Sequence, residues 1–408
     1  MRKKIRIGEI ILGEDEKAAL HTVIESGYIT EGKFSHKFEI GFADYIGAKA
    51  GVITNSGTSS LLLGIKALQI DERFPKIAAG KKVITSPVTY AATSNSIVLS
   101  GMEPVYADID PATFKLIPES VEKAVLEHGS QNIGLILPVH LMGYPNDMDA
   151  LQLIADKYDL QIFEDSAQAH GAQYKGKSIG TFGICSAYSF YVAHNIQAGE
   201  MGAVLTSDPV LERNMRSLKA NGRCCACRRC VRNETGCVMM KPGDDEFHDP
   251  RFIHDHIGYN FKTTDFCAAL ACTMLEKAEE IRMQRYRNVV KMNELLKNFS
   301  DIIQLPVLSE DFSYLGYPVL IRKESGIRRA NLLKLLDEAG VENRPLFGCI
   351  PLHQPSFSYL RKQYMGRLPN AEYVGTHGFY IGCHQFLSDD DLLFMAEAFQ
   401  KVIKGLKK

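Results

Sequence analysis

Three things are missing from this sequence: a sizeable net charge, a long apolar run and an internal repeat. The 47 Lys and Arg residues nearly balance the 48 Asp and Glu residues, so no overall field attracts nucleic acid or an anionic membrane. No stretch approaches the roughly 20 apolar residues that span a bilayer. Glu9 and Glu14 interrupt the N-terminal apolar residues, which argues against a signal peptide. We therefore expect a cytoplasmic protein without nucleic-acid or membrane partners, in which cysteines stay reduced.

Short apolar runs alternate with helical patterns through the first half of the chain. Helical patterns include Ser59–Ala67, Ile117–Glu127 and Asp149–Tyr158. The runs predict strands at Gly51–Thr54, Lys82–Thr85, Glu103–Asp108, Ile133–Pro138, Gln161–Glu164, Cys185–Phe190 and Ala203–Thr206. This order is typical of an α/β fold with a large, mostly parallel sheet covered on both faces. Ligands of such sheets bind at the carboxyl ends of the strands.

A second α/β pattern occupies the C-terminal part. It comprises a long helix from about residue 264 to 296, a strand at Gly316–Ile321 and helices at Ile327–Ala339 and Asp389–Lys404. We expect a large domain of residues 13–285, with a polar, cysteine-rich loop at 222–256. A small C-terminal domain would hold residues 286–408 together with 1–12. Arg282, Arg285 and Arg287 are expected on the solvated face of the long helix.

Three polar segments follow predicted strands. Asn55-Ser56-Gly57-Thr58 opens a helix, where free amides suit a phosphate, although hydroxyl residues there are also ordinary N-caps. Asp165 could pair with a protonated pyridine nitrogen, or cap the next turn. Residues 188–202 run from a strand through a tight turn to a strand and include His194. A lone histidine is more often structural than catalytic.

Nine segments carry a family resemblance. They are NSGTSSLLLGIKAL, SPVTYAATSNSI, PVYADIDP, PVHLMGYPNDMDAL, FEDSAQAHGA, GTFGICSAYSF, GEMGAV, GYNFKTTDFCAAL and ENRPLFGCIPLH. In this order and spacing the chain resembles the DegT/DnrJ/EryC1/StrS sugar aminotransferases almost end to end. The resemblance implies the PLP-dependent transferase (aminotransferase type I) fold, with pyridoxal 5′-phosphate (PLP) or pyridoxamine 5′-phosphate (PMP) as cofactor. It also implies a homodimer with active sites shared across the interface.

The resemblance also assigns cofactor contacts. The matching positions are Gly57, Thr58 and Ser189 for the phosphate, Asn260 for the phosphate of the partner subunit's site, Tyr90 for stacking on the ring, Asp165 for the pyridine nitrogen and Gln168 for a neighbouring ring contact. Arg344 and His384 lie where the family lines its sugar pocket, and arginine suits a diphosphate. Structural roles are equally open for these two residues.

Position 194 departs from most of the family. Most members have a lysine there, which bonds covalently to the cofactor. The imidazole of His194 cannot form that bond but can act as a base near neutral pH. The branch with histidine comprises PMP-dependent 3-dehydratases of nucleotide-linked 4-keto-6-deoxyhexoses. The resemblance therefore implies that His194 is the base in 3-dehydration, leading to 3-deoxygenation of a nucleotide sugar for a lipopolysaccharide or another glycosylated product.

Five cysteines fall between Cys224 and Cys237. Such dense thiols indicate a metal or cluster site, and spacing does not separate zinc from iron–sulfur because both take four thiolates. One His-bearing branch, the iron–sulfur-containing CDP-4-keto-6-deoxyglucose 3-dehydrases, holds a [2Fe–2S] cluster in this loop and receives electrons from a separate reductase. Ala167 stands where that branch has its first ligand. The expected ligands are Cys225, Cys227, Cys230 and Cys237, with Cys224 as substitute; a [4Fe–4S] cluster or zinc are the other options.

Two alternative functions stay open. The first is a cluster-independent 3-dehydratase in which glutamate regenerates PMP and the loop binds structural zinc. The second is a non-catalytic regulator that keeps both cofactor and cluster. Other residues of chemical interest are expected in the core: His140, His170, Cys185, Cys267, Cys272, Cys349 and Cys383.

Overall fold

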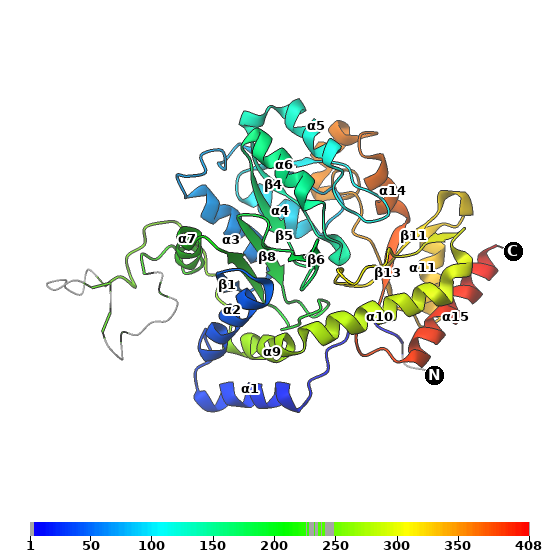
Figure 1. The fold of residues 1–408 in the computed structure, drawn as a ribbon, viewed down its shortest axis with the longest axis horizontal. Helices are drawn as coiled ribbons and strands as arrows, with labels where there is room; N and C mark the ends of the chain where they lie inside the picture. The colour runs from blue at the N-terminus through cyan, green and yellow to red at the C-terminus, as the bar shows by residue number, and fades with distance from the viewer. Residues whose placement is uncertain are drawn as a thin grey trace.

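The computed structural model describes residues 4–225, 227, 232, 236, 237, 239, 240 and 249–407. Its larger sheet has the strand order β1-β9-β8-β5-β4-β2-β3 (Figure 1). The strands are β1 (Ala50–Thr54), β2 (Lys82–Thr85), β3 (Glu103–Tyr106), β4 (Ile133–Leu137), β5 (Gln161–Asp165), β8 (Cys185–Ser189) and β9 (Gly202–Thr206). The strands expected from the sequence are confirmed, with ends that differ by one or two residues at most. A separate short hairpin pairs β6 (Gln173–Tyr174) with β7 (Lys177–Ser178).

The sheet is mostly parallel, with one exception. β9 runs antiparallel to both of its neighbours, β1 and β8. The pairs β8–β5, β5–β4, β4–β2 and β2–β3 are all parallel. The carboxyl ends of β1, β5 and β8 therefore meet at one edge, which is where ligands bind in such sheets.

Helices cover both faces of this sheet. α3 (Gly57–Gln69) and α7 (Pro209–Lys219) pack on one face, and α2 (Lys33–Ile46) and α9 (Asp265–Glu276) on the other. Successive residues of β1 divide between the faces: Val52 joins the core under α3 and α7, and Ile53 the core under α2 and α9. This is the alternation that a strand buried on both sides requires. The other helices of this part are α1 (Glu14–Ser26), α4 (Ala91–Leu99), α5 (Pro118–His128) and α6 (Met148–Tyr158).

A second, antiparallel sheet lies in the C-terminal part of the chain. Its strand order is β10-β11-β13-β12. The strands are β10 (Ile303–Gln304), β11 (Tyr317–Ile321), β12 (Asn343–Pro345) and β13 (Gly378–Ile381), and the helices α11 (Arg329–Glu338), α12 (Ile350–His353), α13 (Arg361–Tyr364), α14 (Pro369–His377) and α15 (Asp389–Leu406). Ile5 pairs with Val341, so the N-terminal residues lie beside this part. The proposed domain boundary after residue 285 falls inside α10 (Ala278–Leu296), which packs on α15.

The long helix expected from residue 264 to 296 is two helices. α9 ends at Glu276, and Lys277 has φ −105° and ψ 4°, so α10 starts in a new direction. The expectation that its arginines are solvated is wrong for two of them: Arg282 is 8% exposed and Arg285 0%. Arg287 is exposed, as expected. Among the described residues, no helix is long and apolar enough to cross a membrane.

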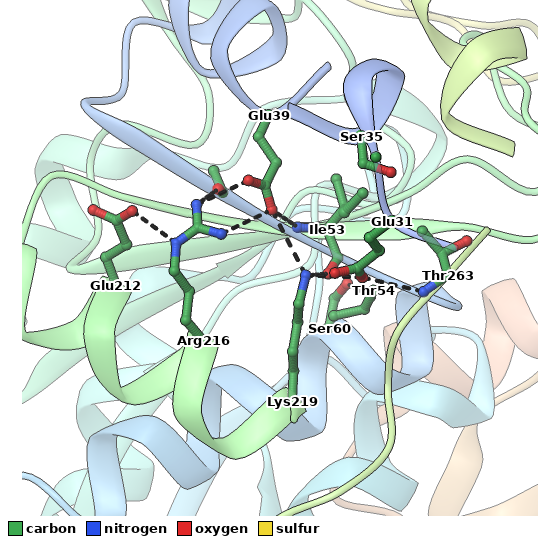
Figure 2. Close-up of polar contacts among 12 residues, drawn as sticks. Glu31, Ser35, Glu39, Ile53, Thr54, Ser60, Glu212, Arg216, Lys219 and Thr263 are labelled. Atoms are coloured by element: carbon green, nitrogen blue, oxygen red, sulfur yellow. Dashed lines mark hydrogen bonds and ion pairs between the residues drawn. The ribbon is translucent and has the colours of Figure 1, made fainter. Parts of the chain in front are cut away.

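A buried ion-pair network joins α2 to α7 (Figure 2). Arg216 Nη2 lies 2.9 Å from Glu39 Oε2, and Arg216 Nε lies 2.9 Å from Glu212. Lys219 Nζ lies 3.0 Å from Glu31 and 3.7 Å from Glu39. The side chains of Arg216, Lys219 and Glu39 are almost completely buried. These charges therefore depend on one another, because burial removes the water that would otherwise solvate them.

The network also holds the backbone of β1. Glu39 Oε1 accepts the N–H of Ile53 at 3.1 Å, and Lys219 Nζ donates to the carbonyl of Ile53 at 2.8 Å. Glu31 accepts the N–H of Thr263 at 3.2 Å, which adds the segment before α9. The strand that leads into the candidate phosphate loop is thus held by side chains from α2 and α7, and Glu31 connects this network to the segment before α9 (Figure 2).

Replacing Glu39 tests the importance of this network. We expect Glu39→Ala to lower the free energy of unfolding by about 3–5 kcal/mol, because Arg216 and Lys219 lose a buried carboxylate. Urea unfolding followed by circular dichroism measures the change. The matched control is Glu14→Ala, since Glu14 pairs with Lys17 on the surface and its loss should be within error. Equal effects of the two substitutions would contradict a structural role for the network.

Candidate active site at the carboxyl edge of the large sheet

The expected phosphate contacts meet where α3 begins. Ser56 is the N-cap, and its hydroxyl accepts the N–H of Ser59 at 3.2 Å, so the capping interpretation holds for this residue. The amides of Gly57 and Thr58 lie in the first turn, where no intrahelical acceptor exists. Gly57 packs on the end of β8, because a Cβ there would lie 2.5 Å from Ser189 Cβ. The structure therefore brings Gly57, Thr58 and Ser189 together beside a positive helix terminus.

Asp165 ends β5 and is buried. Thr93 Oγ1 donates to Asp165 Oδ2 at 2.7 Å, and the N–H of Ala167 donates to Oδ1 at 3.2 Å. Burial raises the pKa of Asp165, and these two hydrogen bonds, together with the nearby imidazole of His140, oppose the rise. The capping role is thus present, and Thr93 is a contact that no sequence pattern indicated. No basic side chain within the described residues forms an ion pair with Asp165, so a positive ligand group would compensate its charge.

Two further cofactor candidates are Gln168 and Tyr90. Gln168 Oε1 accepts the N–H of Met142 at 2.8 Å, which fixes the amide. Tyr90 precedes α4 and is 63% exposed, with its ring 6.0 Å from the ring of Phe347. An exposed aromatic at the strand edge is free to stack on a planar ligand.

His194 lies on the loop that joins β8 to β9. At the base of the loop, the N–H of Phe190 donates to the carbonyl of Met201 at 2.8 Å. The residues after His194 are held from outside: Asn195 Nδ2 donates to Ser313 Oγ at 2.7 Å, and the N–H of Ile196 donates to His170 Nδ1 at 3.2 Å. The position of the imidazole is therefore set by segments far away in the sequence.

The imidazole of His194 is poorly solvated although the residue is partly exposed. Burial, assisted by the positive charge of Arg285, lowers the pKa of His194 to about 3. Its Nδ1 is buried and has no hydrogen-bond partner among the described residues. The ring of His170 lies 5.9 Å away. His194 is therefore neutral near pH 7, the form that can accept a proton.

A cleft of about 580 Å³ opens beside Tyr90. Its lining includes Tyr90, Arg329, Arg344, Phe347, His353 and Tyr380. Arg344 thus shares a cleft with the candidate ring contact, whereas His384 is 2% exposed and does not line it. Two guanidinium groups among aromatic walls suit an anionic ligand with a planar or apolar part.

Asn260 is exposed and lies next to the phosphate loop of its own chain. Its backbone forms a bridge with Ala220, and the carbonyl of the following residue, Phe261, accepts the N–H of Asn55 at 2.9 Å. The rings of Tyr259 and Phe261 stack at 4.6 Å. The segment Gly258–Asn260 is thus held next to the candidate site. Contact of Asn260 with the site of a partner subunit stays a prediction.

The cysteine-rich segment is described only in part. Cys225 Sγ lies 3.7 Å from Cys227 Sγ, Cys237 is half-buried, and Cys230 lies outside the described residues. The described residues alone hold no group of three or more His, Cys, Asp or Glu that suits a metal ion. The core interpretation is confirmed for His140, His170, Cys185, Cys272, Cys349 and Cys383, which are buried, whereas Cys267 is half-buried.

The fold is that of the PLP-dependent aminotransferases, a large mixed sheet with an α/β layout. The chain belongs to the DegT/DnrJ/EryC1/StrS aminotransferase family, whose model matches residues 11–400.

Three similar proteins illustrate the activities named within the family. The lipopolysaccharide biosynthesis protein RfbH of Salmonella typhimurium is 31% identical over 96% of this chain and 90% of its own length. The dTDP-4-dehydro-2,6-dideoxy-D-glucose 3-dehydratase of Saccharopolyspora spinosa is 31% identical over 98% of this chain and 86% of its own. A solved GDP-4-keto-6-deoxymannose-3-dehydratase with a trapped PLP–glutamate geminal diamine has a TM-score of 0.85 at 25% identity and covers 97% of this chain and 100% of its own. Other similar structures carry aminotransferase names.

The contact between Gly57 and Ser189 can be tested directly. We expect Gly57→Ala to weaken PMP binding at least about tenfold, because the added methyl would displace Ser189 and distort the phosphate cradle. Isothermal titration with PMP measures the loss. Gly405→Ala is the matched control, since nothing lies within 4 Å of a Cβ built there. Unchanged PMP affinity in Gly57→Ala would remove this loop from the phosphate site.

Proposed function

We propose that the protein is a PMP-dependent 3-dehydratase of a nucleotide-linked 4-keto-6-deoxyhexose, with His194 as the base. The observation that carries the proposal is a neutral histidine on the β8–β9 loop, at the position where most of the family has a cofactor-binding lysine. The 3-dehydratases among the similar proteins support the same reaction. A nucleotide sugar that lost its C3 hydroxyl would feed polysaccharide or glycoside synthesis.

The residues at the sheet edge fit a PLP-type cofactor. The crowded cradle at Gly57 and Ser189 leaves backbone amides for a phosphate, and buried Asp165 forms no ion pair among the described residues. A protonated pyridine nitrogen would supply that charge and hold Asp165 ionised. When bound, PMP supplies an amine for the C4 ketone of the sugar and a ring that takes up electrons.

Three side chains would have separate roles in the reaction. Arg344 would bind the diphosphate of the substrate in the cleft that it shares with Tyr90, and Tyr90 would stack on the cofactor ring. With PMP and the sugar bound, neutral His194 would accept a proton from the carbon that carries the PMP amine and could pass that proton to the C3 hydroxyl, which then leaves as water. It has no amine with which to bond the cofactor, which is consistent with dehydration rather than transamination.

The active form in this proposal is a homodimer. Tyr90 and Asn260 are both exposed in the single chain, as residues that complete a shared site would be. Asn260 of one subunit would reach the phosphate bound by the other.

Replacing the base tests this function. We expect His194→Asn to reduce water loss from the sugar at least about 100-fold, since general bases contribute 10²–10⁴. PMP affinity should change less than about threefold, because the cradle residues are untouched. Mass spectrometry of the sugar and titration with PMP give the two readouts, with surface His21→Asn as control. Retained dehydration in His194→Asn would exclude His194 as the base.

We further propose an iron–sulfur cluster held by Cys225, Cys227, Cys230 and Cys237, with a separate reductase as electron donor. The 3.7 Å approach of the Cys225 and Cys227 sulfurs supports this. The competing interpretation is a glutamate-regenerated enzyme with structural zinc, which the PLP–glutamate adduct in the similar 3-dehydratase favours. Turnover with glutamate and no reductase would support that alternative.

Metal analysis separates the two. Purified without oxygen, the protein should be brown and contain iron and sulfide in comparable amounts. Cys225→Ser should lose at least half of the iron, whereas Cys267→Ser, outside the segment, should keep it. Colourless protein with one zinc per chain would exclude the cluster.

A further inference from the structure

The outer edge of β1 is closed by side chains in place of a neighbouring strand. β1 stands at one end of the strand order of the larger sheet, and within the described residues β9 is its only strand partner. An edge strand leaves every second N–H and C=O group without a partner in the sheet, and such groups cost free energy when they are buried. Residues 51–54 are buried, so this edge needs partners from elsewhere in the chain.

Two buried cations of α7 hold successive carbonyl groups on this edge. Arg216 Nη2 donates to the carbonyl of Gly51 at 2.9 Å, near the start of β1. Lys219 Nζ donates to the carbonyl of Ile53 at 2.8 Å, one residue before the strand ends (Figure 2). Both cations also form ion pairs with Glu39, and their side chains are 7% and 6% exposed. Arg216 and Lys219 therefore differ mainly in the part of β1 that they hold.

Lys219 has a second connection to the candidate site, through its backbone. Its carbonyl accepts the N–H of Phe261 at 3.1 Å, and the carbonyl of Phe261 accepts the N–H of Asn55 at 2.9 Å. Asn55 directly follows β1, and Phe261 directly follows Asn260. Lys219 thus binds the strand that leads into the phosphate loop with its ammonium group, and the segment that carries Asn260 with its carbonyl. Both segments hold residues expected at the cofactor phosphate.

The end of β1 is joined in turn to the first turn of α3. Thr54 Oγ1 donates to the carbonyl of Ser56 at 2.9 Å and lies 2.7 Å from Ser60 Oγ. The amides of Gly57 and Thr58 lie between these two serines in the chain. A displacement of the end of β1 would therefore also displace the amides that are expected to bind the phosphate.

We propose that Lys219 is a positioning residue for the phosphate of the cofactor: it holds the end of β1 and the segment that carries Asn260, so that the backbone amides at the start of α3 face the phosphate. This inference rests on the cofactor of the proposed function, and binding of that cofactor can be measured without turnover. The competing explanation is that Lys219 only balances the charges of Glu31 and Glu39. In that case its loss would lower the stability of the protein without any effect that depends on the phosphate group.

Calorimetric titration of the full chain with PMP and with pyridoxamine, which lacks the phosphate group, separates the two explanations. We expect Lys219→Met to raise the Kd of PMP at least about tenfold, the factor that corresponds to about one hydrogen bond from a charged group. The Kd of pyridoxamine should change less than about threefold, because this ligand does not use the phosphate loop. Arg216→Met is the matched control, since it removes the other buried cation of the same network. It should lower the stability to urea as Lys219→Met does, but keep the wild-type ratio of the two Kd values.

An unchanged ratio of the two Kd values in Lys219→Met, or an equal change in Arg216→Met, would overturn the inference. If Lys219→Met does not fold, hydrogen exchange of the wild type decides: PMP should slow exchange at the amides of Ile53 and Phe261 more than pyridoxamine does, and equal exchange with the two ligands would overturn the inference. A wild type that does not bind PMP would refute both the inference and the proposed function. The expected change in Lys219→Met, together with a sugar that keeps its C3 hydroxyl, would refute the proposed function alone.

Discussion

Gly202 is the position on which the candidate site depends. It pairs with Thr54 of β1 on one side and with Ser189 of β8 on the other. A Cβ at this residue would lie 2.4 Å from the carbonyl oxygen of Ser56, so the phosphate loop can approach only a glycine. Because β9 is antiparallel to both neighbours, the chain returns from β8 by a short loop at the carboxyl edge. That loop carries His194 to the end of the sheet where Asp165 lies.

Burial shifts the pKa values of Asp165 and His194 in opposite directions. It raises the pKa of Asp165 and lowers that of His194, so both are pushed toward their neutral forms. A cationic ring nitrogen at Asp165 would restore its charge, whereas His194 is already unprotonated, the form in which an imidazole can accept a proton. The same buried environment is therefore compatible with an ionised Asp165 and a neutral His194, provided that the ligand supplies a positive charge next to Asp165.

Much of the large sheet could be predicted because its signals are local. An apolar run such as Ile133–Leu137 with a helical pattern after it identifies a strand without any long-range contact. The order of nine motifs, NSGTSSLLLGIKAL and FEDSAQAHGA among them, indicated the family, and the structure brings Gly57 and Ser189 into contact. The Thr93–Asp165 hydrogen bond was not predictable, since Thr93 carries no pattern that distinguishes it from other helix residues.

The sequence by itself determined the strands, the family and the histidine at position 194, because each of these depends on neighbouring residues or on the order of motifs. Only the tertiary structure decided the surroundings of that histidine. Arg285 looks like one of three solvated arginines until residues 314 and 315 and Gln385 close over it. The physical reason is that burial depends on what packs against a helix from elsewhere in the chain, and helical spacing alone carries no information about that partner.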